Sequence, residues 1–423
     1  MSSSGPRVRS PLFWAWFVVA AACEQPAEIG LPGGVPFLEQ DSAGVLVATT
    51  MGARARTPIG WVVDTVPEYQ LGAVEGQEPY LFSRISGAQQ LSDGRVVVVD
   101  AVSCELRFFG QAGDFLELAG GKGEGPGEFN AGLAGRCDLI PSPGIDSLRV
   151  FDGARLSLLD DRGRFSRRFP VSWPGQFVTH VAGVAGDRVL AESRSVGMSR
   201  EEGMSHEPST ADFALLELES WRVVWEGFFP GQHSYTVWLN GSPVGRTVYS
   251  VPFDIRPRAA LGKDGYYLTL GEEQGPEILE YDLLGGLRRV IRLGEPVLVP
   301  SREELDKYVE LQVDRQNIPD TSRKKVSDGL RRQYGEMSLP KIMPVFARLL
   351  VDEVGWLWAE LYRFDVRQPV RWLVFGPNGE GLGSVDMPPD LDVRQIGGDF
   401  VLGVWRDVHG VEYARRHALT GRR

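Results

Sequence analysis

The chain has 423 residues and a formal net charge of −11, from 45 Lys and Arg residues against 56 Asp and Glu residues. Non-specific nucleic-acid binding requires a basic face, so a protein this acidic is expected to have no nucleic-acid partner. The 51 glycines and 28 prolines indicate many turns, as folds built from short β-strands require.

The N-terminus has the pattern of an export signal. Arg7 and Arg9 precede a short apolar run, LFWAWFVVAAAC, which ends at Cys23. A basic start, a short apolar region and small residues before a cleavage site are typical of a secretory signal. The apolar run is shorter than the roughly 20 residues that a membrane span needs. We therefore expect a signal peptide at 1–22.

The ending AAAC resembles the lipobox of bacterial lipoproteins, in which the cysteine carries lipid and becomes the mature N-terminus. Ala20 departs from the usual leucine of that pattern, and an ordinary signal with an incidental Cys23 is the alternative. Glu24 follows, whereas an aspartate there often retains lipoproteins at the inner membrane. The resemblance implies lipidation of Cys23, a flexible tether at 23–43, and a place in the bacterial cell envelope, at the outer membrane. The lipid is then the expected membrane contact.

A unit of about 40 to 50 residues recurs along the rest of the chain. It is clearest at 80–119, where Asp93 and Gly94 give a hairpin signal and RVVVVD follows as a β-branched run. The weaker copies occupy 136–169, 177–229, 253–293, 345–386 and 391–419. Repeats of this length that hold four strands are typical of β-propeller blades. We therefore expect an all-β chain with a six-bladed β-propeller at 44–423.

The last copy offers only three strands, whereas a propeller closes its ring to protect the strand edges. Ring closure often takes a strand from the other end of the chain. Two N-terminal segments have a strand pattern, WVVDTVPEYQLG at 61–72 and GVLVATT at 44–50. Either segment can complete the sixth blade.

The glycine-rich run GGKGEGPGEF, 120–129, has the composition of a phosphate-binding loop but lacks its pattern. Lys122 is followed by Gly123, so the hydroxyl that a nucleotide-binding P-loop needs is missing, and no helix pattern follows. The run lies between the first two repeats, which predicts an inter-blade connector anchored by Phe129. The stretch from 91 to 129 resembles the NHL-type repeat of six-bladed propellers. This resemblance covers about 60–420 as an architecture, not as a site.

A helical insertion is expected between blades four and five, at 300–337. Ser301 and Glu304 form a capping box, and Leu305, Tyr308 and Val309 have the spacing of one helical face. A second helix is expected from about 322 to 334. The insertion is either a decorated loop or a lid or docking element over one face of the ring.

Basic residues recur where the inner strand of each blade is expected to begin. They are Arg84, Arg136, His180, Arg256, Arg258, Arg348 and Arg394. If these strands line a central channel, the guanidinium groups converge at one mouth and favour a carboxylate, a phosphate or an acidic peptide. Alternatively, the arginines are solvated or pair with acids between blades, such as Asp93 or Asp352.

Some propellers of related type are gluconolactonase-like hydrolases or lyases that hold a divalent metal with Glu, Asn and Asp ligands. The inner strands here offer Asp138, Asp254 and Asp392, but no Glu or Asn at matching positions. Ca²⁺ is therefore expected only under this enzymatic alternative, and otherwise no cofactor. The five histidines include none beside a serine in the setting of a nucleophile elbow.

Cys104 and Cys137 are the cysteines that follow Cys23. In an oxidising compartment an even pair can form a disulfide, and both are expected at turns on the same face of neighbouring blades. The sequence favours a cell-envelope module without catalytic activity that binds an anionic small ligand or an unknown envelope protein. The alternatives are a metal-dependent hydrolase or lyase at the central channel and a purely structural part of an envelope complex.

Overall fold

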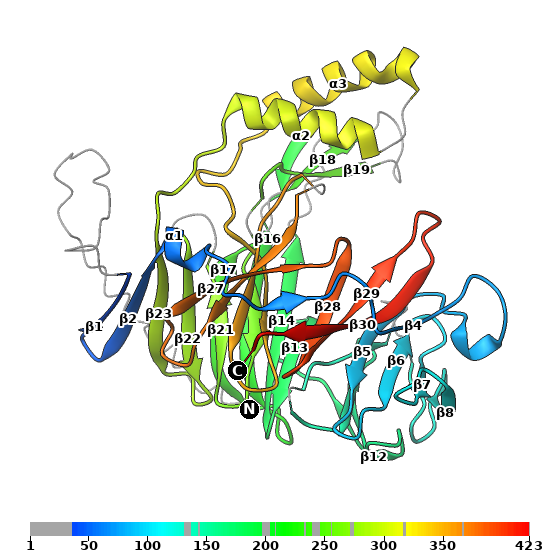
Figure 1. Cartoon of the computed structure of the whole chain (residues 1–423). Coiled ribbons are helices and arrows are strands. Elements are labelled where there is room, and N and C mark those ends of the chain that lie inside the picture. Colours follow the sequence, from blue (N-terminus) through cyan, green and yellow to red (C-terminus); the bar gives the residue numbers. More distant parts are fainter. Residues whose placement is uncertain are drawn as a thin grey trace, which may run out of the picture.

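The computed structural model shows an all-β six-bladed propeller with a helical insertion between blades four and five, as the repeats predict (Figure 1). The residues that the structure describes are 36–130, 137–142, 144–196, 204–207, 209–231, 234–238, 246–254, 256–270, 275–315, 319–365 and 368–422. The expected signal peptide, Cys23 and Arg136 lie outside these ranges.

Blades one and two are four-stranded antiparallel sheets. Blade one consists of β5 (Ile85–Gln90), β6 (Val96–Asp100), β7 (Glu105–Phe109) and β8 (Phe115–Gly120). Blade two consists of β9 (Asp138–Leu139), β10 (Leu148–Phe151), β11 (Arg155–Leu159) and β12 (Phe165–Pro170). All five residues of β6 are buried, which explains why this strand is a continuous β-branched run rather than an alternating one.

Blades three, four and five repeat the same order. Blade three consists of β13 (Val178–Ala185), β14 (Arg188–Val196), β16 (Ser209–Glu217) and β17 (Val223–Pro230). Blade four contains β20 (Ala259–Leu261), β21 (Gly265–Thr269), β22 (Glu277–Asp282) and β23 (Leu287–Gly294). Blade five consists of β24 (Phe346–Val351), β25 (Leu357–Leu361), β26 (Val370–Phe375) and β27 (Gly381–Met387).

Blade six closes the ring with strands from both ends of the chain. Its first three strands are β28 (Leu391–Ile396), β29 (Phe400–Arg406) and β30 (Glu412–Thr420). The N-terminal strands β3 (Val62–Val63) and β4 (Tyr69–Leu71) both pair antiparallel with β30. Of the two closing segments that the sequence allows, 61–72 is therefore the one that completes blade six.

The other candidate, 44–50, lies on blade four. There, β2 (Val45–Met51) pairs in parallel with β23 and antiparallel with β1 (Phe37–Ser42), so blade four has six strands. The expectation of a flexible tether does not hold for 37–42, because these residues pair with β2 across a short turn. Figure 1 shows β1 and β2 side by side at the edge of blade four, with the short helix α1 (Gly52–Ala55) following them.

A small subdomain, which we call the cap, combines three insertions. It contains α2 (Arg302–Arg315), α3 (Asp320–Gly335) and a three-stranded sheet. The strands of that sheet are β15 (Met204–Glu207), β18 (Ser234–Trp238) and β19 (Arg246–Ser250). In Figure 1 both helices lie beside β18 and β19, above one face of the ring. Ser301 and Glu304 form the expected capping box at the start of α2, each backbone N–H meeting the other side chain.

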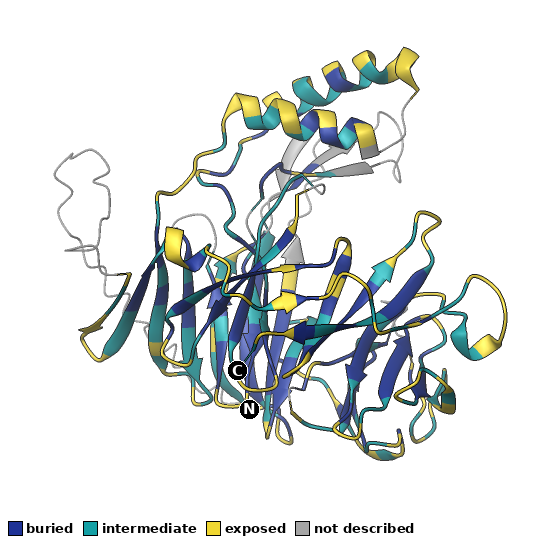
Figure 2. Ribbon diagram, in the orientation of Figure 1, coloured by how far each residue is buried: buried dark blue, intermediate teal, exposed yellow. Residues whose placement is uncertain are grey.

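The hydrophobic core is divided among the interfaces between blades, and the strands are largely buried while the outer faces of the cap helices are exposed (Figure 2). The cap has a core of its own, in which Tyr235 and Val251 pack against Val309, Tyr334 and Met337. Within the described part of the chain, no helix combines the length and the apolar character needed to cross a membrane.

The glycine-rich run is the connector between blades one and two. Phe129 is fully buried in the cluster between these blades. Gly120 has a φ of 80°, and a Cβ there would lie 2.8 Å from both the Cys104 carbonyl oxygen and the Phe129 ring. A side chain at this position is therefore excluded by both conformation and space. The structure also joins Cys104 to Cys137 in a disulfide beside this connector.

Candidate functional site

The inner strands of all six blades line one cavity of about 680 Å³ along the axis of the propeller. Each blade contributes its first strand, from β5 through β9, β13, β20 and β24 to β28. A volume of this size lies within the range of ordinary small-molecule sites. The cavity is therefore large enough to hold a ligand.

Most of the predicted basic residues reach this cavity. The lining residues include Arg84, His180, Arg258, Arg348 and Arg394. Arg256 does not line it, but its charge acts on Arg258. The lining also contains basic and acidic residues that the sequence did not single out, namely Arg194, Glu192, Glu353, Asp390, Arg406 and Glu412. Charge alone therefore does not identify the binding group, and the partners of each arginine must be considered.

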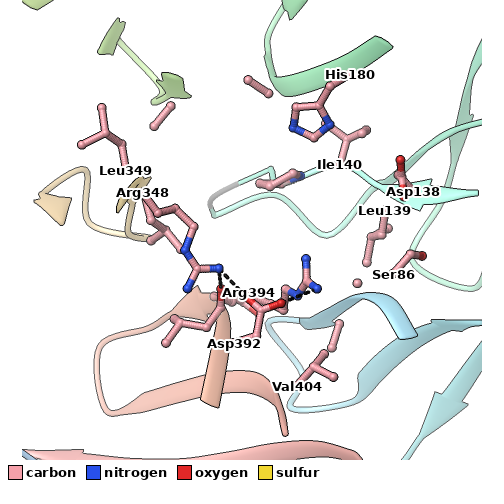
Figure 3. Close-up of a pocket in the computed structure, with 18 of the residues that line it drawn as sticks. Ser86, Asp138, Leu139, Ile140, His180, Arg348, Leu349, Asp392, Arg394 and Val404 are labelled. Carbon is pink, nitrogen blue, oxygen red and sulfur yellow. Dashed lines mark hydrogen bonds and ion pairs between the residues drawn. The ribbon is translucent and has the colours of Figure 1, made fainter. Parts of the chain in front are cut away.

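Two of the arginines are held in ion pairs (Figure 3). The Arg348 guanidinium lies 3.1 Å from Glu360 and also pairs with Asp392. It stacks on the Trp372 ring at 5.0 Å. Arg394 lies 2.7 Å from the same Asp392 carboxylate. These contacts fix Arg348 in the wall between blades five and six. Arg394 pairs within its own strand, and its buried Nε has no hydrogen-bond partner among the described residues.

The alternative that the arginines pair with acids between blades holds for Arg348, whose partner Asp392 lies on blade six. Arg394 pairs with Asp392 of its own strand, and neither pair involves the acids expected. Asp93 pairs with Arg95 at 2.6 Å, outside the cavity. Asp352 pairs with Arg422 at 2.7 Å. Sequence spacing does not reveal the partners of Arg348, because Glu360 comes from a second strand and Asp392 from a neighbouring blade.

Arg258 differs from its neighbours, because no described residue forms an ion pair or a side-chain hydrogen bond with its guanidinium. Its Nε atom is buried and has no hydrogen-bond partner. Burial, followed by the charges of Arg256 and Arg194, lowers its pKa to about 10. The group therefore remains protonated at neutral pH, as a partly desolvated cation in a positive environment.

The backbone around Arg258 is fixed on both sides. The Arg258 N–H donates to Thr269 Oγ1 at 2.8 Å, and the Thr269 N–H donates to the Arg258 carbonyl at 2.9 Å. Upstream, Phe253 is almost fully buried, and its ring packs against Tyr308 of α2 and Phe364 of blade five. The segment that carries Arg258 is therefore held between the propeller and the cap.

The cap lies on the same face of the propeller as the end of the cavity that holds Arg258 and Arg84. The three cap insertions follow β14, β17 and β23, and each of these strands ends at the side where inner strands begin. Arg258 directly precedes β20, and Arg84 directly precedes β5. Arg84 is exposed, lines the cavity and has no side-chain partner among the described residues. His180 projects from β13 on the wall opposite Arg348 and Arg394 (Figure 3).

The acids considered as metal ligands do not converge. Asp138 and Asp392 line the cavity, but Asp392 is already engaged by two arginines, and Asp254 lies outside the cavity lining. Among the residues that the structure describes, no group of three or more His, Cys, Asp or Glu side chains is placed to hold a metal ion. The described donor set therefore does not fit Ca²⁺, which takes six to eight oxygen ligands.

The sequence matches no protein-family model and no curated protein. Several solved structures align with most of the chain at low similarity. A streptogramin B lyase aligns at 9% identity and a TM-score of 0.34, covering 84% of this chain and 98% of its own. A luciferin-regenerating enzyme aligns at 11% identity and a TM-score of 0.32, covering 80% and 92%. A protein of unknown function from Bacteroides thetaiotaomicron aligns at 10% identity and a TM-score of 0.36, covering 85% and 76%.

Proposed function

We propose that this protein is an envelope-anchored binding module that takes a small anionic ligand into its central channel. The observation that carries the proposal is Arg258, a partly buried guanidinium that lines the cavity without a carboxylate partner in the described structure. A protein gains nothing in stability from a desolvated cation of this kind. A bound anion would supply the missing charge and accept the unused hydrogen bonds.

Guanidinium chemistry limits the class of ligand. The planar group presents parallel N–H donors that match a carboxylate or a phosphate in two-point contacts. Arg84 adds a second unpartnered cation at the rim of the same cavity. Salt screens the attraction between a partly buried cation and its bound anion less than it screens a surface ion pair. We therefore expect a specific site rather than diffuse attraction.

Arg258→Gln is expected to weaken binding of glutarate, used as a probe, by about tenfold or more. The loss corresponds to hydrogen bonds to a charged group, which contribute roughly 1.5–3 kcal/mol. Isothermal titration calorimetry measures the affinity. The melting temperature should stay unchanged or rise, because the substitution removes an uncompensated charge.

Arg167→Gln is the matched control, because Arg167 is an exposed arginine that pairs with Glu219 on the outside of the propeller. It should bind glutarate as the unaltered protein does. Equal affinities of the Arg258 and Arg167 variants for glutarate would contradict the proposal. It would also be contradicted if the unaltered protein bound none of glutarate, citrate and phosphate.

The N-terminal pattern supports the cellular side of the proposal. We propose that 1–22 is removed as a signal peptide, that Cys23 carries the lipid anchor at the outer membrane, and that the repeats are NHL-like. β1 begins at Phe37, so the tether spans only the residues between Cys23 and this strand. The channel is then held close to the membrane, where it meets ligands or partner proteins of the envelope.

Cys23→Ser is expected to abolish incorporation of radiolabelled palmitate when the chain is expressed in a Gram-negative bacterium. The thiolate is the group that receives lipid, and a serine hydroxyl does not replace it. The variant should accumulate as unprocessed precursor or as soluble periplasmic protein. Cys104→Ala with Cys137→Ala is the control and should retain the label. Labelling of the Cys23→Ser variant would contradict lipidation at this residue.

A further inference from the structure

The two ends of the channel carry different charged groups. The end where the inner strands begin holds Arg258, together with the Arg348–Asp392 pair. The opposite end lies where β24 and β28 finish, and there the Glu353 N–H donates to the Ile396 carbonyl at 3.2 Å. Glu353 lines the same cavity as Arg258. The channel therefore has a cationic group near one end and a carboxylate near the other.

Glu353 has no ion-pair partner among the residues described. Its Oε1 accepts a hydrogen bond from Gln395 Nε2 at 2.6 Å. The side chain is exposed at this end of the channel, and partial desolvation, followed by the negative charges of Asp352, Asp399 and Asp146, raises the pKa of its carboxyl. An approaching cation would relieve this repulsion. Glu353 is thus the counterpart of Arg258, because each lines the cavity without forming an ion pair with a described residue; the charge of Glu192 acts on Arg258 from a distance.

The strand geometry gives the separation between these ends. Arg348 and Val351 lie three positions apart on β24, which corresponds to about 10 Å at roughly 3.3 Å per residue, and Glu353 lies in the turn beyond the end of that strand. Arg258 precedes β20, the inner strand next to β24, and so lies near the Arg348 end. The wall between the ends includes small residues from three blades, namely Gly87, Ala88, Ala182 and Ala260. This wall leaves room for a narrow, extended molecule.

We propose that the ligand of the channel is an extended zwitterion with its carboxylate at Arg258 and its amine at Glu353. A peptide of about four residues has the required length, because an extended chain spans about 3.3–3.6 Å per residue. This inference rests on the proposed anion-binding function and adds the second recognition group. It makes a short peptide with free ends the substrate class, in preference to a fatty acid or a phosphate.

Three tetraglycine probes test the proposal by isothermal titration calorimetry. They are tetraglycine, N-acetyl-tetraglycine, which lacks the amine charge, and tetraglycine amide, which lacks the carboxylate. Tetraglycine is expected to bind roughly twofold to fivefold more tightly than its acetylated form, the ratio that one exposed ion pair supplies. The amide is expected to bind more weakly than both. In Glu353→Gln, tetraglycine and its acetylated form should have equal affinities.

Glu219→Gln serves as the control, because Glu219 is an exposed acid outside the channel. It should keep the preference for the free amine. Equal binding of tetraglycine and N-acetyl-tetraglycine by the unaltered protein would overturn the zwitterion while leaving the anion site intact. A preference that survives in Glu353→Gln would overturn the role of this carboxylate. If glutarate and both carboxylate peptides fail to bind, the proposed function itself fails.

Discussion

Asp352→Ala is expected to lower the free energy of unfolding by about 3–5 kcal/mol, the usual cost of removing one partner from a buried ion pair. Asp352 is 1% exposed and Arg422 is nearly as buried. One carboxylate oxygen accepts from Arg422 and from the Trp358 indole, each at 2.7 Å. The other accepts from two backbone N–H groups of its own turn. Alanine would leave all four donors without this acceptor.

This cluster also closes the ring. The Arg422 guanidinium lies 5.1 Å from the Trp61 ring and 4.9 Å from the Trp356 ring, and the two indoles stack on each other. Trp61 directly precedes β3, Arg422 follows β30, and Asp352 and Trp356 belong to blade five. The network therefore ties both ends of the propeller sequence to a blade that neither end belongs to. Its loss should first weaken the contact between blade five and the two terminal segments, which we call the closing seam.

Urea denaturation followed by tryptophan fluorescence measures this effect, since several indoles report on the seam. Asp386→Ala is the matched control, because Asp386 pairs with Arg371 on the surface at 2.6 Å. An exposed pair of this kind contributes about 0.2–1 kcal/mol. Arg422→Ala should lower the free energy of unfolding by an amount between those of the two variants, since Asp352 would keep its indole and backbone donors. A loss in Asp352→Ala no larger than in Asp386→Ala would show that the cluster does not hold the seam.

The sequence predicts the fold well because blades are defined by local patterns. β-branched runs such as 95–100 and turns such as 93–94 place strands without knowledge of distant contacts. The sequence does not determine the closing strand, because 44–50 and 61–72 have equally good strand patterns. The choice depends on contacts between residues that are hundreds of positions apart in the sequence, including the contact between Trp61 and Arg422. No local signal contains that information.

The candidate site shows the same limit. The sequence predicts arginines near the starts of the inner strands, and most of them line the cavity. It does not predict that Glu360 and Asp392 neutralise Arg348 while Arg258 forms no ion pair with a described residue. These partners come from other strands, and their approach is set by the tilt and order of whole blades. Glu353 was missed because it occupies an ordinary Asp–Gly turn, and only the closed ring places that turn at the end of a channel.

Removing the Cys104–Cys137 disulfide is expected to destabilise the protein by about 3–4 kcal/mol. The two residues are 33 positions apart, and the chain-entropy model gives this value for a loop of that size. Both residues are fully buried in the cluster between blades one and two. The cross-link spans the glycine-rich connector, which is the part of this interface with the least regular structure. We therefore expect the loss to appear as early separation of blade one from blade two.

Two forms distinguish the contribution of the cross-link to stability from that of sulfur packing. One is the double variant Cys104→Ala, Cys137→Ala, and the other is the reduced protein with unaltered sequence. Both forms lack the covalent bond, so both should unfold at lower urea concentrations than the oxidised protein. The alanine variant should lose somewhat more, because it also leaves a small cavity. Hydrogen exchange of 120–129 should rise in both forms. An unchanged urea midpoint on reduction would contradict a stabilising role. Free thiols at both positions in protein isolated from the cell envelope would contradict the oxidising location on which the pairing was predicted.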